Sequence, residues 1–208
     1  MRKLSFVFFA ICILSCKHKP KYNPEAVKLN NLAVKLFMQS VDSNNKQNAI
    51  NLLNKATAID SNYFTAYWNK LSFQMGLKQY DNALITARRI TVIRPNNAYV
   101  QAMVGNLLEI KGDSISSKPN FNASLLLYNK MLDTINVKDS RYKDVVFGKA
   151  TDLIMLGKQS EANILLKQLY NSTTDTVYRQ MYMQYIGKDR KTTIEGLMKP
   201  DTVSTSAK

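Results

Sequence analysis

Residues 67–97, "YWNKLSFQMGLKQYDNALITARRITVIRPNN", decide the fold. Apolar residues recur three and four positions apart on both sides of a short turn near Gly76, and Pro95 closes the stretch. This 3.6-residue period predicts two amphipathic helices, over residues 63–75 and 80–92. The chain of 208 residues has only 7 glycines and 5 prolines, which favours helices over a β fold with many turns.

The second half of this stretch resembles the second half of a tetratricopeptide repeat. The matching residues are Tyr80-Asp81-Asn82-Ala83, then Ala87 and Pro95. A small residue at Ala83 lets the second helix approach the first closely, and Pro95 ends that helix. Thirty-four residues upstream, which is the period of the family, Ala49 aligns with Ala83. The resemblance implies an all-α, right-handed superhelical solenoid of helix-turn-helix repeats; an unrelated all-helical solenoid or bundle is the alternative.

The same pattern recurs along the chain and sets the expected boundaries. In the third repeat an insertion over 114–120 (SISSKPN) is expected to delay the second helix and to place Ser124 at its small position. Residues 177–187 are expected to form a C-terminal capping helix, because terminal repeats need a more polar outer face. Residues 188–208, rich in Lys, Thr, Ser and Asp, are expected to form a flexible tail. The four predicted repeats cover 30–63, 64–97, 98–138 and 143–176.

The N-terminus has the parts of an export signal. A cationic start, Met1-Arg2-Lys3, precedes the apolar run 4–14, which is too short to span a bilayer. The next residues, Ile13-Leu14-Ser15-Cys16, resemble the lipobox of bacterial lipoproteins. The resemblance implies a signal peptide over 1–15, a lipid on Cys16 and a lipidated basic tether over 16–29.

Two other interpretations of this segment stay open. An uncleaved membrane anchor is one of them. The other is a metal site made of Cys12, Cys16 and His18, which would lack a fourth ligand elsewhere in the chain.

The net charge of +14 would make nucleic acid the first partner to consider for a cytosolic protein. Export changes that expectation, so no nucleic-acid partner is expected. Cleavage would leave a net charge of +12, with Lys17, Lys19 and Lys21 beside the lipid. Each could contribute about 1 kcal/mol near an anionic membrane surface; a solvated linker is the alternative. The absence of an acidic residue beside Cys16 favours, by resemblance, an outer-membrane lipoprotein facing the periplasm.

The folded body contains few residues that carry chemistry. No cysteine follows Cys16 and no histidine follows His18, which excludes Cys–His and Ser–His nucleophilic pairs and His-based zinc sites there. The glycines are scattered, so no phosphate-binding loop is present. Asp144 and Asp152 share one predicted helix and are interpreted as a solvated face rather than a glycosidase pair. We therefore expect no catalytic residue, no metal and no cofactor.

The resemblance implies a concave groove lined by the first helix of each repeat. Trp68 and Tyr99 would be its aromatic anchors, although Trp68 fits a core position equally well. The Lys and Arg side chains with which chaperone-binding tetratricopeptide domains hold a peptide carboxylate are absent from the matching positions. The groove candidates are Met38, Thr65, Trp68, Ser72, Tyr99, Asn106, Phe147 and Thr151.

Together these patterns predict a non-catalytic, lipid-anchored interaction scaffold of the bacterial cell envelope that binds a partner helix or peptide in its groove. Its partners would be other envelope proteins or peptides, and the membrane through Cys16. Two alternatives are a cell-wall or glycan-binding accessory lipoprotein that uses its basic surface, and a pilotin or assembly factor of an envelope complex.

Overall fold

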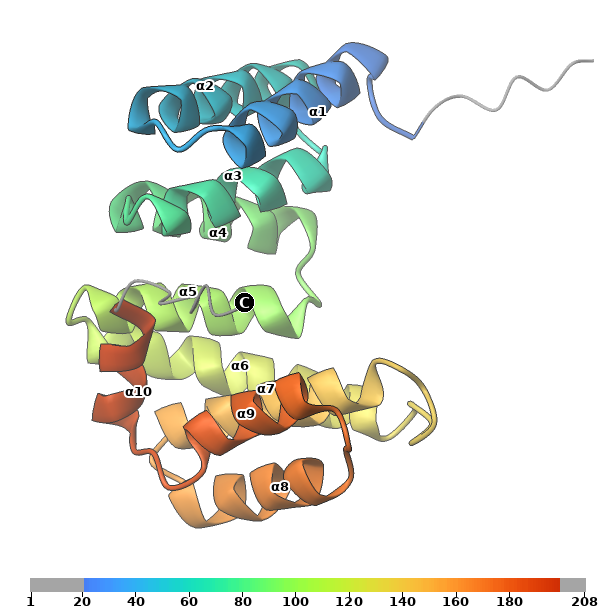
Figure 1. Cartoon of the computed structure of the whole chain (residues 1–208), viewed down its shortest axis with the longest axis vertical. Helices are drawn as coiled ribbons and strands as arrows, with labels where there is room; N and C mark the ends of the chain where they lie inside the picture. The colour runs from blue at the N-terminus through green and yellow to red at the C-terminus, as the bar shows by residue number, and fades with distance from the viewer. Residues whose placement is uncertain (1–20, 199–208) are drawn as a thin grey trace, which may run out of the picture.

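The computed structural model describes residues 21–198, which form ten helices and no strand (Figure 1). Residues 1–20, which contain the predicted signal peptide and Cys16, and residues 199–208 lie outside the described part of the chain. The helices in chain order are α1 (Pro24–Gln39), α2 (Ser43–Ile59), α3 (Phe64–Gly76), α4 (Tyr80–Ile93), α5 (Ala98–Ile110), α6 (Ser114–Leu132), α7 (Tyr142–Met155), α8 (Gln159–Asn171), α9 (Thr176–Tyr185) and α10 (Arg190–Met198).

The first eight helices form four hairpins, α1–α2, α3–α4, α5–α6 and α7–α8, stacked one on the next (Figure 1). The second helix of each hairpin also packs against the first helix of the following one, and α9 continues the series by packing on α8. The result is an all-helical solenoid whose core runs along the stack rather than lying at one centre.

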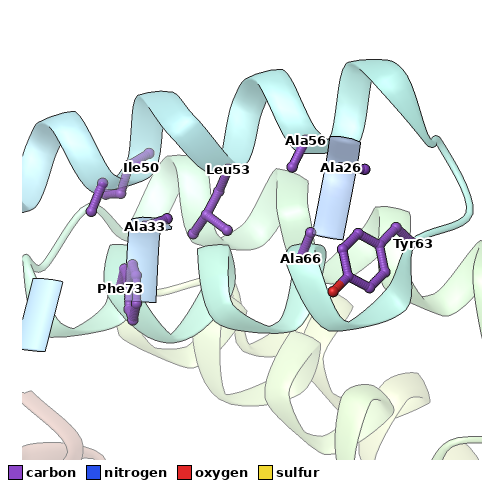
Figure 2. Packing of buried hydrophobic residues seen from close by; sticks show 9 residues of the cluster. Ala26, Ala33, Ile50, Leu53, Ala56, Tyr63, Ala66 and Phe73 are labelled. Atoms are coloured by element: carbon purple, nitrogen blue, oxygen red, sulfur yellow. The ribbon is translucent and has the colours of Figure 1, made fainter. Parts of the chain in front are cut away.

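Small side chains allow the helices to approach closely within each hairpin. Ala49 and Ala83, the pair aligned by the 34-residue period, are both fully buried. In the first hairpin Leu53 and Ile50 fill the space between α1, α2 and α3, beside Ala33 and Ala66 (Figure 2). Burial of such aliphatic side chains stabilises each interface by about 1.5–3 kcal/mol per large residue.

The turns that end the first helices share one geometry. In the third and fourth repeats Gly112 and Gly157 adopt φ of 80° and 79°, and in the second repeat Lys78 adopts φ of 55° at the equivalent place. Each of the three donates its N–H to the carbonyl three residues earlier, at 2.9 Å. The following N–H bonds to the carbonyl five residues earlier, at 2.8–2.9 Å, which completes a Schellman motif. Lys78 therefore occupies a left-handed conformation that favours glycine.

The predicted insertion at 114–120 is wrong in its position. Helix α6 begins at Ser114, 34 residues after the start of α4, so the repeat period is maintained. Asp113 caps α6 by accepting the Ser116 N–H at 3.0 Å, and the helix continues through Pro119. The extra residues lie instead at the C-terminal end of α6 and in the loop before α7.

The small position of the third repeat is also different from the prediction. Ser117, which follows Ala83 by 34 residues, is fully buried and takes that position. Ser124 is buried about two turns further along the same face of α6, where its hydroxyl donates to the Ala98 carbonyl at 2.8 Å. Serine serves at both places because it is small and its hydroxyl finds an acceptor.

Two other boundaries differ from the sequence prediction. Residues 24–29 of the predicted tether belong to α1, because Asn23 caps that helix by accepting the Glu25 N–H at 2.9 Å and Ala26 is fully buried. Part of the predicted flexible tail is helix α10, which packs against α5 and α7. The predicted capping helix corresponds to α9. Among the described helices, none combines the length and apolar character needed to cross a membrane.

We predict that Lys78→Gly stabilises the protein by up to about 1 kcal/mol, because glycine adopts the left-handed conformation without steric cost. Urea unfolding followed by circular dichroism would measure the change. Lys78→Ala is the matched control, since alanine removes the charge and keeps the Cβ atom. An equal gain from both variants would contradict backbone strain as the cause.

Candidate binding groove

A groove of about 460 Å³ lies between α5, α7, α9 and α10. Helix α5 contributes Tyr99 and Asn106, and α7 contributes Phe147 and Thr151. Helices α9 and α10 close the opposite side, and both come from the sequence after the last predicted repeat. The C-terminal helices therefore convert a shallow concave face into a bounded groove.

Four of the eight predicted groove residues line this one space: Tyr99, Asn106, Phe147 and Thr151. All four lie on the first helices of the third and fourth repeats, α5 and α7. Whether they contact a partner stays a prediction.

The other four predicted residues lie outside this groove, on the first two repeats. Met38 is 76% exposed near the end of α1. Thr65 and Ser72 are exposed on α3, where the Ser72 hydroxyl donates to the Trp68 carbonyl at 3.1 Å.

Trp68 is half-buried and links two repeats. Its ring lies 5.3 Å from that of Tyr99 at an interplanar angle of 55°, and 5.9 Å from that of Phe64. It packs on the core of α3, α4 and α5. Trp68 therefore packs on the core and contacts the groove residue Tyr99, but it does not line the groove itself.

Two glycines allow large rings to pack on helix backbones behind the groove. A Cβ atom on Gly148 of α7 would collide with the ring of Tyr128 of α6, and both residues line the groove. A Cβ atom on Gly105 would lie 2.8 Å from the ring of Phe121. These contacts join α6 to its two neighbouring helices, so the groove wall is continuous with the core.

Methionine and tyrosine side chains give the groove its chemical character. The aromatic contacts extend to α9, where the Tyr185 ring meets the edge of Phe147 at 5.1 Å and 89°. Methionine is flexible and polarisable, and tyrosine combines apolar area with one hydroxyl, so this lining suits an apolar partner of variable shape. The groove contains Met75, Met103, Met155, Met181, Tyr99, Tyr128, Tyr178 and Tyr185.

Asp152 is the unusual residue of the groove. Its side chain is 1% exposed on α7, and its Oδ2 atom has no hydrogen-bond partner in the described part of the chain. Burial raises the pKa of Asp152 to about 7, and the neighbouring Ser124 hydroxyl opposes this effect only in part. The prediction of a solvated face is wrong for Asp152, because α7 is covered by α6, α8 and α10. It holds for Asp144, which is exposed and also lines the groove.

The charge of the groove is opposite to that of the chain. Asp144 and Asp152 are the charged residues among its lining, and no Lys or Arg of residues 21–198 lines it. The basic side chains lie elsewhere: Arg89, for example, donates to the Ser61 carbonyl at 3.0 Å. The groove is therefore locally acidic on a protein whose net charge is +14.

A partly buried ion pair between Arg190 and Glu109 holds α10 in place. Arg190 donates from Nε to Glu109 Oε2 at 3.2 Å and forms a second bond from its terminal nitrogen to Oε1. Glu109, on α5, is 5% exposed and also accepts the hydroxyls of Ser114 and Ser117. The pair fixes the start of the helix that brings Thr193 and Leu197 to the groove. Its members are 81 residues apart, and no local pattern indicates their contact.

No protein-family model matches the chain, and no curated protein matches it in sequence. Solved structures do match its fold. The nearly identical tetratricopeptide-like repeats of a kinesin light chain protein from Podospora anserina superpose with a TM-score of 0.55 and 14% identity, over 83% of this chain and 87% of that one.

Two further structures are similar. PilW, a widely conserved type IV pilus biogenesis factor, gives a TM-score of 0.50 at 15% identity, over 83% and 79% of the two chains. YrrB, a tetratricopeptide protein with an unusual peptide-binding site, gives 0.49 at 16% identity, over 83% and 82%. At these identities the likeness is one of fold. The chain has a tetratricopeptide-like helical repeat fold, as its 34-residue period indicates.

Among residues 21–198, no group of three or more His, Cys, Asp and Glu side chains is arranged to hold a metal ion.

We predict that Arg190→Ala releases α10 from α5 and α7. Removal of the cation leaves Glu109 as a buried charge, which costs about 3–5 kcal/mol where the rest of the structure stays in place. Hydrogen–deuterium exchange should therefore rise over residues 190–198 while α1–α4 stay protected. Arg141→Ala is the control, because its ion pair with Asp139 is at the surface and should contribute less than about 1 kcal/mol. Unchanged exchange in α10 would contradict the role of the pair.

Proposed function

We propose that this chain is a non-catalytic protein-interaction module that binds a helix or an extended peptide of a partner in the groove between α5, α7, α9 and α10. The observation that carries the proposal is the convergence of four predicted residues on one space: Tyr99, Asn106, Phe147 and Thr151. Methionine and tyrosine side chains make up much of the remaining lining. Bounded grooves that combine apolar area with a few polar groups are the usual sites for such ligands.

The tetratricopeptide-like fold supports this proposal, since stacked repeats present extended concave surfaces to a partner. Lipid attachment at Cys16 would hold the module at the bacterial envelope, with Lys17, Lys19 and Lys21 near the lipid surface and the repeats in the periplasm. Helix α1 begins at Pro24, so only a short tether would separate the lipid from the first repeat. Even fully extended, the eight residues between the lipid and α1 would reach about 30 Å, so the first repeat would lie near the membrane surface.

A role in assembling an envelope complex is the sharper version of the same proposal. PilW is described as a type IV pilus biogenesis factor, and it shares the repeat fold at a TM-score of 0.50. The likeness supports a common architecture.

Site-specific photo-crosslinking in native membranes tests the groove. We predict that a photoreactive residue in place of Thr151 captures a partner, and that Tyr99→Ala in the same chain abolishes the capture. The control is the same probe at Ile85, which is exposed on α4, the second helix of the second repeat. A partner captured equally from both positions, or one indifferent to Tyr99→Ala, would mean that the groove is not the binding site.

Metabolic labelling with a palmitate analogue tests the anchor. We predict that Cys16→Ser abolishes incorporation of the label, because the lipid would be attached through the Cys16 sulfur. Cys12→Ser should leave labelling intact, since Cys12 would be discarded with the signal peptide. Labelling that survives Cys16→Ser, or that requires Cys12, would overturn the lipoprotein assignment without affecting the groove.

A further inference from the structure

We propose that the groove selects a partner segment in which a single Lys or Arg side chain is flanked by apolar residues, and that this cation pairs with Asp152. The inference rests on the proposed function and gives the partner its chemistry. It stands on three observations: a buried carboxyl group with one unpaired oxygen, a groove lining without basic residues, and an apolar surround.

The first observation is the geometry of Asp152. Its side chain is 1% exposed, it lines the groove, and its Oδ2 atom has no hydrogen-bond partner in residues 21–198. A buried carboxylate oxygen normally accepts hydrogen bonds, and leaving it unpaired costs free energy. A cationic group that enters the groove would supply both the missing donor and the opposite charge.

The second observation is the charge of every element that faces Asp152. Helix α7 contributes Asp144, a second carboxyl group. The titratable groups contributed by the other lining helices are phenols: Tyr99 on α5, Tyr128 on α6, and Tyr178 and Tyr185 on α9. No Lys or Arg of the described chain lines the groove, and the Arg190 guanidinium is already bound to Glu109. An anionic ligand would meet two carboxyl groups and no cation.

The third observation is the apolar surround. Four methionines and the Phe147 ring would contact the residues on either side of the cation. Tyrosine faces also attract cations, typically by about 0.5–2 kcal/mol. The long methylene chain of Lys or Arg can pack on these side chains while its charged end reaches Asp152.

The net charge of the protein limits how basic this partner can be. A strongly polybasic segment would be repelled by the net positive charge of the protein, whereas one cation among apolar residues meets mainly the local field of the groove. Salt screens charges beyond about 8–10 Å, so the two nearby carboxyl groups dominate for a single cation. The partner is therefore apolar with one positive charge, rather than a basic tail.

The experiment is peptide selection from a random phage-displayed library on the full chain, followed by affinity measurement. We predict that selected peptides are enriched in a single Lys or Arg between apolar residues. The enrichment should disappear on Asp152→Asn, a nearly isosteric variant that removes the charge. Asp133→Asn is the matched control, because Asp133 is exposed at the end of α6 and lies outside the groove.

A measurement on the unmodified protein makes the test independent of any variant. Replacing the Lys of a selected peptide by norleucine keeps the apolar stem and should weaken binding by about tenfold, which is ~1.4 kcal/mol. Binding of the Lys peptide should also strengthen as the pH rises from about 6 to about 8, because Asp152 must release its proton to pair with a cation.

The outcomes separate this inference from the function on which it rests. Peptides that require Tyr99 and Phe147 but carry no cation, or a norleucine peptide that binds as well as its Lys parent, would overturn the charge selection and leave groove binding intact. Failure to select any peptide that depends on Tyr99 or Phe147 would overturn both.

Discussion

The close approach of paired helices is the constraint on which the whole structure depends. At the crossing of each hairpin the second helix presents a small, fully buried residue: Ala49, Ala83, Ser117 and Ala162. A larger side chain at any of these positions would separate the helices or strain their rotamers, at a typical cost of 1–3 kcal/mol. Because each hairpin packs on the next, a wider spacing at one crossing would alter the position of every helix beyond it.

The period of these small residues explains how much of the fold the sequence reveals. In the second repeat, the predicted ends of α3 and α4 agree with the structure to within one residue, since Tyr80, Ala83 and Pro95 mark them locally. In the third repeat the prediction of a loop is wrong, because residues 114–120 (SISSKPN) have the composition of a loop but form the start of α6. There, helix α6 is stabilised by long-range contacts: Ser117 donates to Glu109, which in turn binds Arg190. Such tertiary contacts override local propensity and leave no periodic pattern.

The candidate site was predictable only where its helices belong to the repeats. Tyr99, Asn106, Phe147 and Thr151 converge because first helices of adjacent repeats share one face. The groove is bounded because α9 and α10 fold back beside them, and the ion pair that docks α10 joins residues 81 positions apart. Met38, Thr65 and Ser72 occupy the equivalent face of the first two repeats, which no C-terminal helix covers.

The net charge of the chain does not predict the charge of the groove, because most of the charged residues lie on the outer surface. Asp152 shows what the sum conceals. Its carboxyl group is buried with one oxygen unpaired, so once it ionises above about pH 7 it destabilises the folded state by several kcal/mol. Because the folded protein binds this proton more tightly than the unfolded chain, the contribution of Asp152 to stability falls as the pH rises from about 4 to about 7. An asparagine would fill the same space without that cost, so the folding of α7 does not require the charge. A group that weakens the fold and faces a groove is best explained by what it can bind there, and the same burial that penalises the lone carboxylate would strengthen its attraction to an incoming cation.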